Sequence, residues 1–196
     1  KDVGDGITVT ASGYTIADKD SFKASNYNLL DTSKTTTANI SKADLTATLN
    51  DDVKTYDGTS YSGGNGITYN GFVNGETASL LGGNLVYSGT SQGAKDAGNY
   101  IISGSGLTSN NYNISFVNGK LTINKKDLTI SNITANNKTY DGTTTATLSN
   151  IGTLVGLVTG ENLVLNNPTS VIFSSKDVAD GITVTASGYT IADKDS

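Results

Sequence analysis

The chain has 196 residues, a formal net charge of −5 and no Cys, His, Met or Trp. Without Cys and His, the usual zinc sites, cysteine nucleophiles and nucleophile–histidine pairs are impossible, so we predict neither an enzyme nor a transition-metal site. Because acidic residues outnumber basic ones, the chain is not expected to have the basic surface that nucleic acids and anionic membranes require. No apolar run approaches the roughly 20 residues of a membrane span, so membrane insertion is not expected.

The end of the chain repeats its beginning. Residues 1–21 and residues 176–196 are identical at 20 of 21 positions, and only Gly4 and Ala179 differ. Near-identity at a fixed offset predicts a tandem array, of which the chain covers one period and a short overlap. Long, uniform surface stalks and fibres are built from such arrays.

Strands are predicted along most of the chain, because β-branched and aromatic residues alternate with polar residues between Gly, Asn and Asp. ITVTASGYTI at residues 7–16 shows this period of two. The one helix candidate is ETASLL at residues 76–81, which Gly82-Gly83 would end after at most two turns. Asn118-Gly119 predicts a type I′ hairpin. The chain is therefore predicted to be all-β, with at most one short helix per unit.

A weaker repeat lies inside the period. KTYDGT occurs at residues 54–59 and 138–143, and other landmarks follow both copies in the same order. This order predicts two related units. We expect residues 1–41 to be the closing half of a unit from the preceding repeat, 42–124 a complete unit, and 125–196 the first part of the next. The junctions lack Gly/Ser-rich or Pro-rich linkers, so the units are expected to stack directly, end to end.

Both copies of KTYDGT contain a Tyr-Asp-Gly motif. Its residues are Tyr56, Asp57 and Gly58 in the first copy, and Tyr140, Asp141 and Gly142 in the second. Asp-Gly suits a tight turn, and a tyrosine can bury its ring while its hydroxyl bonds to the backbone. We therefore interpret the motif as a structural turn. A ligand-binding or catalytic Tyr–Asp pair is the alternative, but no base or electrophile accompanies it.

The landmarks carry a resemblance to known repeats. KTYDGT, GFVNGETASLLGG and KDAGNYIISGSGLTSNNYNISFVNGKLTI together resemble the MBG-type repeat of large bacterial surface proteins. LTISNITANNKTYDGTTTATL through KDVADGITVTASGYTI, closed by SNYNLLDTSKTTTANI, resembles the related YDG-type repeat. The resemblance implies small β-grasp-like domains, otherwise β-sandwiches, without catalytic residues. It also implies the context of very large secreted adhesins, including filamentous-haemagglutinin-like and biofilm matrix proteins, where such repeats resemble spacers or stalks.

Carboxylates are the remaining candidates for chemistry. Glu76 and Glu161 occupy equivalent positions after GFVNG and GLVTG, and each is expected to cap or begin a short turn or helix. Catalysis of a Lys–Asn isopeptide crosslink by one of them is the alternative. The aspartates at positions 18, 20, 31, 51 and 52 are interpreted as solvated turns. Calcium is the alternative there and the one cofactor left open, because it stiffens surface arrays through oxygen ligands.

Together these features predict a structural repeat of an extracellular bacterial adhesin or filament, which acts as a stalk or spacer in attachment or biofilm matrix. The alternative is a glycan- or protein-binding module that acts through avidity, with the tyrosines of residues 42–124 as its surface. The expected partners are neighbouring repeats, joined head to tail or by strand complementation, and a host or matrix glycan. In strand complementation, residues 1–41 of one copy would complete the unit begun by residues 125–196 of its neighbour.

Overall fold

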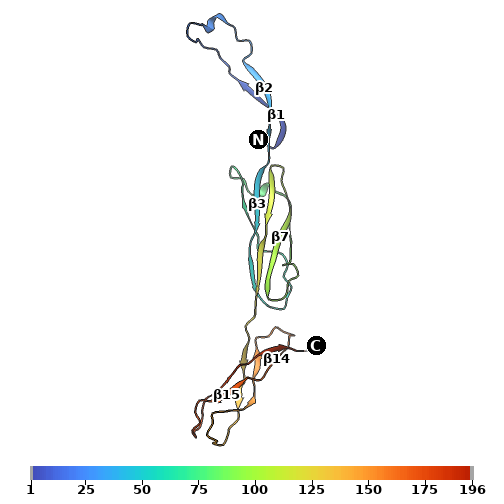
Figure 1. The fold of residues 1–196 in the computed structure, drawn as a ribbon. Coiled ribbons are helices and arrows are strands. Elements are labelled where there is room, and N and C mark those ends of the chain that lie inside the picture. The colour runs from blue at the N-terminus through green and yellow to red at the C-terminus, as the bar shows by residue number, and fades with distance from the viewer. Residues whose placement is uncertain (1, 195–196) are drawn as a thin grey trace. The chain divides into compact units, whose positions relative to one another are not determined.

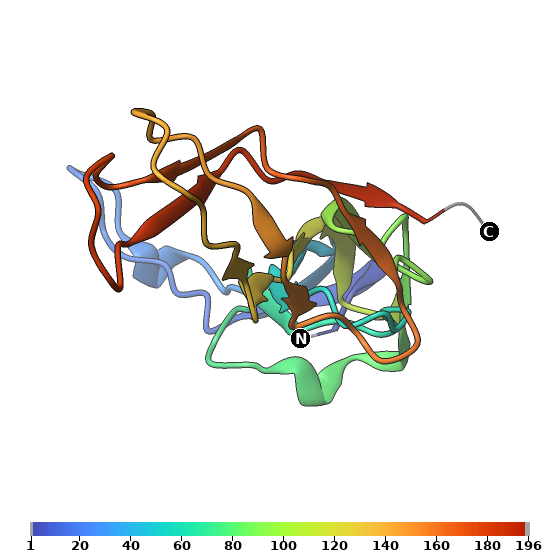
Figure 2. The same cartoon turned by 90° about the horizontal axis from the view of Figure 1, so that it is seen from below.

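The computed structural model describes residues 2–194, and the prediction of an all-β fold is confirmed (Figure 1). The helices of this part are two three-residue 3₁₀ turns, η1 (Ala24–Asn26) and η2 (Ala78–Leu80), which Figure 2 shows as short coils. The helix expected at residues 76–81 is thus a single turn, because Gly82 already pairs with Thr108 in a strand. Neither helix has the length and apolar character needed to cross a membrane.

The chain divides into two compact units. Unit 1 comprises the chain up to Asp52, Tyr61–Ala94 and Asn99–Leu121. Unit 2 comprises Val53–Ser60, Lys95–Gly98 and the chain from Thr122 onward. The first KTYDGT turn therefore belongs to unit 2, together with the second.

In unit 1, β1 (Gly4–Ser12) and β2 (Ser33–Ile40) form an antiparallel two-stranded hairpin. Its register pairs Val9 with Thr36, and Gly13 N donates to Thr32 O at 3.1 Å. Every residue of β2 is exposed, as is most of β1. The hairpin therefore lacks a buried face, and a two-stranded hairpin without one is only marginally stable.

Two sheets contain the strands between residues 43 and 124. β3 (Ala43–Leu49) is central in the first, antiparallel to β5 (Ile67–Asn70) and parallel to β8 (Tyr112–Val117). The second has four strands, in the order β4 (Asp52–Thr55), β9 (Gly119–Asn124), β7 (Gly98–Thr108) and β6 (Gly82–Ser88). β8 and β9 thus follow each other in the chain but lie in different sheets.

The hairpin predicted at Asn118-Gly119 is therefore wrong, since β8 and β9 do not pair with each other. Gly119 is needed there for a different reason. A Cβ at this position would lie 2.6 Å from Leu49 O and 2.7 Å from Asn50 O. The glycine lets two backbones approach closely, which is a requirement that a local turn signal does not distinguish from a hairpin.

The core of these two sheets is supplied mainly by β3, β7, β8 and β9. The buried apolar residues up to position 124 are Leu45, Ala47, Leu49, Ala94, Ile102, Tyr112, Leu121 and Ile123. Those on β3 and β9 recur at every second position, because alternate side chains of a strand share one face. β8 and β9 together contribute three of the eight, so this core depends on the last two strands of the domain.

The strands from Thr129 onward form smaller sheets, each of two antiparallel strands. The pairs are β10 (Thr129–Ser131) with β13 (Thr153–Val155), β11 (Thr134–Ala135) with β12 (Leu148–Asn150), β14 (Leu163–Leu165) with β17 (Ile191–Asp193), and β15 (Ser170–Phe173) with β16 (Val184–Ser187). Within the described residues from 125 onward, Ala146 is the one buried apolar side chain. This region is therefore much less closed than the sheets before it.

Candidate functional site

The first KTYDGT motif begins with the last two residues of β4 and folds into a turn that the side chain of its lysine holds together. Lys54 Nζ donates to Asp57 Oδ1 at 2.8 Å, and to both Thr59 O and Thr59 Oγ1 at 3.1 Å. Thr59 in turn donates from its N and its Oγ1 to Asp57 Oδ1, at 2.9 and 2.7 Å. Gly58 lies between them with φ of +75°. The aspartate thus closes a turn onto the backbone two residues later, and the lysine ties both ends together.

The second motif repeats this lysine turn in detail. Lys138 Nζ donates to Asp141 Oδ1 at 2.7 Å, to Thr143 O at 2.8 Å and to Thr145 O at 3.1 Å. Thr143 N donates to Asp141 Oδ1 at 2.9 Å, and Gly142 has φ of +78°. Lysine and threonine are therefore part of the site, although the sequence argument singled out only Tyr-Asp-Gly. The repetition of the full string KTYDGT was the signal that could have identified them.

The lysine turn lowers the pKa of its aspartate. The hydrogen bond from Lys138, followed by those from Thr143 N and Oγ1, lowers the pKa of Asp141 to about 2. The same contacts from Lys54 and Thr59 hold the pKa of Asp57 well below its ordinary value. Each interaction favours the charged carboxylate, and the folded state therefore binds its proton less tightly than the unfolded chain.

We expect the contribution of Asp141 to stability to disappear in acid. Because its folded pKa is about 2 and its ordinary value is 3.8, the stabilisation is present above pH 3.8 and is lost as the pH falls toward 2. Urea unfolding of the wild type and Asp141→Asn should give midpoints that differ at pH 7 and converge near pH 2. Asp177→Asn is the control, because Asp177 binds Lys176 at 2.7 Å but closes no lysine turn. A wild-type advantage over Asp141→Asn that stays constant with pH would contradict this account.

Two further turns end in the glutamates. Glu76 N donates to Val73 O at 2.9 Å, and Glu161 N donates to Val158 O at 3.0 Å. Asn74 and Gly75, with φ of +54° and +74°, form the central pair of the first turn. Positive φ at both central positions is the signature of a type I′ turn, so this Asn-Gly pair adopts the geometry that was predicted for Asn118-Gly119.

The glutamate side chains accept tyrosine hydroxyls, which the sequence argument did not foresee. Tyr112 Oη donates to Glu76, and Tyr56 Oη donates to Glu161 within unit 2. Tyr112 is only 3% exposed, and its ring meets Phe72 edge-on with centroids 5.4 Å apart. The hydrogen bond to Glu161 raises the pKa of Tyr56 to about 12, and the one to Glu76 raises the pKa of Tyr112. Both hydroxyls donate to glutamates that end the turns, and these hydrogen bonds hold the turns in place.

The tyrosines of residues 42–124 do not form an exposed stack. Tyr112 is buried, and Tyr56, Tyr61, Tyr69, Tyr87 and Tyr100 are each half-buried. Tyr61 Oη donates to Asp52 at 2.8 Å, and Tyr87 Oη accepts from Gly66 N at 3.1 Å. These side chains pack and brace the sheets, so they do not favour the alternative of a glycan-binding surface.

The aspartates for which calcium binding was the alternative act as local hydrogen-bond acceptors. Asp18 Oδ1 accepts from Ala24 N at 2.6 Å, and Asp51 Oδ1 accepts from Lys120 N at 2.7 Å. Asp31 pairs with Lys34 at 2.8 Å. Across residues 2–194, no three carboxylates are grouped so that they could hold a metal ion.

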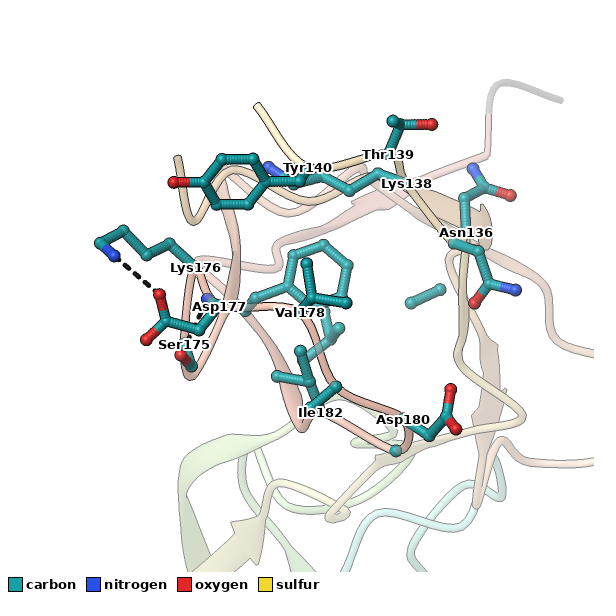
Figure 3. Close-up of a pocket in the computed structure, with 16 residues that line it drawn as sticks. Asn136, Lys138, Thr139, Tyr140, Ser175, Lys176, Asp177, Val178, Asp180 and Ile182 are labelled. Atoms are coloured by element: carbon teal, nitrogen blue, oxygen red, sulfur yellow. Dashed lines mark hydrogen bonds and ion pairs between the residues drawn. The ribbon is translucent and has the colours of Figure 1, made fainter. Parts of the chain in front are cut away.

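A cavity of about 720 Å³ lies beside the second lysine turn in unit 2 (Figure 3). Its lining includes the apolar side chains of Phe173, Val178 and Ile182 together with the ring of Tyr140. Val178 is 85% exposed and Tyr140 58% exposed. Polar side chains, among them Asn136 and Asp180, complete the lining, so the cavity is an open hollow of mixed character rather than a closed pocket with converging acid and base groups.

Comparison with known families identifies two domains in the chain. The model of the MBG domain (YGX type) matches residues 45–122, and that of the YDG domain matches residues 124–196. Searches of curated proteins and of solved structures gave no match. Domains of these two families are typical of repeats in bacterial surface proteins and have no known catalytic function. The resemblance seen in the sequence is confirmed: residues 45–122 belong to the MBG domain family of the YGX type, and residues 124–196, in tandem with them, to the YDG domain family.

Proposed function

We propose that this chain is a structural repeat of an extracellular bacterial adhesin or filament and acts there as a stalk or spacer. The observation that carries the proposal is the identity of residues 1–21 and 176–196 at 20 of 21 positions. Each added copy of a near-identical unit lengthens a stalk by the same amount, and nearest-neighbour contacts suffice to stabilise it. The membership of both domains in families typical of bacterial surface proteins supports the same role.

The connection between the two family matches supports a stiff spacer. The matches end and begin at residues 122 and 124, so only one residue separates them. Inside unit 2, the first lysine turn packs closely against the GLVTGE turn. Tyr56 donates to Glu161, and a Cβ on Gly58 would lie 2.9 Å from Val158 Cγ1. These contacts fix the first lysine turn within unit 2.

Electron microscopy of the native full-length protein tests this function. We expect extended fibres whose axial repeat is about 60–80 Å, the length of two compact domains of this size. Because the repeat is set by the sequence period, each counted repeat should correspond to one MBG–YDG pair.

Flexible threads or separate compact particles would contradict the spacer function. In that case the units would act as independent modules, and a screen against host and matrix glycans would test the binding alternative. An avid module needs many accessible sites but no fixed axial repeat, so the micrographs distinguish the two functions.

A further inference from the structure

We infer that every domain junction of the array is closed by the same clasp, a tyrosine of one domain that donates to a glutamate of the domain after it. In the junction within this chain, Tyr56 of the MBG match donates to Glu161 of the YDG match. By the same contact, Tyr140 of the YDG domain closes the next junction onto the counterpart of Glu76 in the following MBG domain. This clasp deepens the proposed function, on which it rests, because it names the surfaces through which successive periods meet.

The clasp in this chain joins the first lysine turn to the GLVTGE turn inside unit 2. Tyr56 Oη donates to Glu161, and Glu161 N donates to Val158 O at 3.0 Å, which closes the second of these turns. The two turns lie in close contact, because a Cβ on Gly58 would be 2.9 Å from Val158 Cγ1 and 3.5 Å from Glu161 Oε1. A hydrogen bond to a charged acceptor is stronger than one between neutral groups, so the carboxylate is a suitable anchor.

The donor half of the clasp occurs again in the YDG domain. Its lysine turn contains the same hydrogen bond from lysine to aspartate, Lys138 to Asp141 at 2.7 Å, and the same glycine conformation, with φ of +78° at Gly142. Tyr140 therefore extends from the same kind of turn as Tyr56. Figure 3 shows its hydroxyl directed away from the hollow, and the side chain is exposed. The hydroxyl is thus accessible to an acceptor on another domain.

The acceptor half of the clasp occurs again in the MBG domain. The GFVNGE turn closes as the GLVTGE turn does, because Glu76 N donates to Val73 O at 2.9 Å. Glu76 also accepts from Tyr112, but a carboxylate has two oxygens with about four acceptor sites, so a second tyrosine can bind. Val73, the counterpart of Val158, is 51% exposed. The GFVNGE turn can therefore present the same valine and glutamate to a preceding domain.

Contacts of the first residues place YDG sequence beside this acceptor. The first 21 residues carry YDG sequence, because they repeat the end of the YDG match at 20 positions. Val3 N donates to Asn111 Oδ1 at 3.2 Å, and Asn111 Nδ2 donates to Asp2 Oδ1 at 3.3 Å. Asn111 directly precedes Tyr112, which donates to Glu76. A YDG segment and the Glu76 turn thus meet the same two-residue stretch of the MBG domain inside unit 1.

The corresponding segment of the MBG domain lies beside the clasp that is present in this chain. Lys95–Gly98, from KDAGNY, is the counterpart of the KDV segment at the start of the chain and belongs to unit 2 together with Tyr56 and Glu161. Asp96 adds to the rise in the pKa of Tyr56 that the hydrogen bond to Glu161 causes. At both junctions, therefore, this segment of one domain reaches the domain after it. Because the segments correspond, the tyrosine beside each of them is expected to reach the corresponding glutamate.

Engineered disulfides test the second clasp, because the chain has no native cysteine. A Cβ on Gly58 would lie 3.9 Å from Val158 Cβ, a separation that suits a disulfide, so Gly58→Cys with Val158→Cys in this chain is the positive control. The test uses a chain of two periods, in which residues 22–196 follow residue 196 again. It carries Gly142→Cys in the first period and Val73→Cys in the second. We expect it to close a disulfide to the same extent as the positive control, measured by intact mass after alkylation of free thiols.

The matched control places Gly142→Cys and Val73→Cys together in the 196-residue chain. There the GFVNGE turn precedes the YDG domain instead of following it, so no clasp joins the two positions. We expect at least about tenfold less closed disulfide than in the two-period chain. Equal closure in the two chains would overturn the proposal. Circular dichroism of each variant verifies that it folds.

Tyr140→Phe is a second test that requires no cysteine at a glycine position. In the first period of the two-period chain it removes the hydroxyl that donates to the next domain, so the urea midpoint should fall. The same substitution in the last period, which no MBG domain follows, should leave the midpoint unchanged. Equal midpoints for these two variants would contradict the second clasp. They would leave the axial repeat of the native fibre unaffected, because covalent continuity alone can hold a spacer together, so these tests and the micrographs refute different statements.

Discussion

Replacing Leu121 by alanine is expected to lower the free energy of unfolding by about 2–5 kcal/mol. Leu121 is on β9, between β4 and β7 in the sheet, and its side chain is 0% exposed. The substitution removes apolar contacts and leaves a cavity that the surrounding strands fill only in part. Urea unfolding measures the loss, followed by far-UV circular dichroism or tyrosine fluorescence because the chain has no Trp.

Leu80→Ala is the matched control for this substitution. It makes the same chemical change on η2, where the leucine is 56% exposed, so the expected cost is within about 0.5 kcal/mol. Similar costs at both positions would show that β9 does not close the core.

The sequence predicted the class of the fold because alternation and turn residues are local properties. Turn positions were less certain, since one dipeptide serves two purposes in this chain. Asn74-Gly75 has the positive φ values of a type I′ turn, whereas Gly119 is a close-approach glycine in front of β9. Only the neighbouring strand, whose Leu49 lies 70 residues earlier, distinguishes the two.

The repeated segment shows most directly what sequence alone does not determine. GITVTASGYTIADKD occurs twice without a change, yet Gly4–Ser12 is one strand in the first copy. In the second copy this string contains two strands, Val184–Ser187 and Ile191–Asp193, which correspond to residues 9–12 and 16–18 of the first copy. The available partners differ, β2 for one copy and β15 with β14 for the other. The strand with which a segment pairs therefore determines where the segment's own strand begins and ends. Strand propensity determines only which residues are able to form a strand.

The contacts of the candidate site also fall into local ones, which the sequence predicts, and distant ones, which it does not. The lysine turn joins residues within seven positions of each other, such as Lys54 and Thr59, and its glycine conformation followed from the Asp-Gly pair. The contact of Tyr56 with Glu161 spans 105 positions and depends on how β4 and the GLVTGE turn are brought together. A single sequence contains no signal for that distance, even though both residues lie in recognisable repeats.

At Gly106, the backbones of β6 and β7 approach each other so closely that a side chain does not fit. Gly106 has φ of +92°, and a Cβ there would lie 2.2 Å from Asn84 O, next to the register shift between Gly83 and Val86 in the β6–β7 ladder. Gly106→Ala therefore combines backbone strain with a clash that no side-chain movement relieves. We expect it to lower the free energy of unfolding by about 2–5 kcal/mol, measured by urea unfolding.

Gly93→Ala separates the two causes, because Gly93 has a similar φ of +84° but nothing within 4 Å of its Cβ position. Strain alone should cost about 1–2 kcal/mol there. The excess at Gly106 then measures the steric part, which exists only because the bulge brings β6 and β7 so close. If both variants lose the same stability, backbone strain alone explains why glycine is needed at position 106. The close approach of the two strands would then relax at no cost, and the MBG sheet would be softer than its bulge geometry implies.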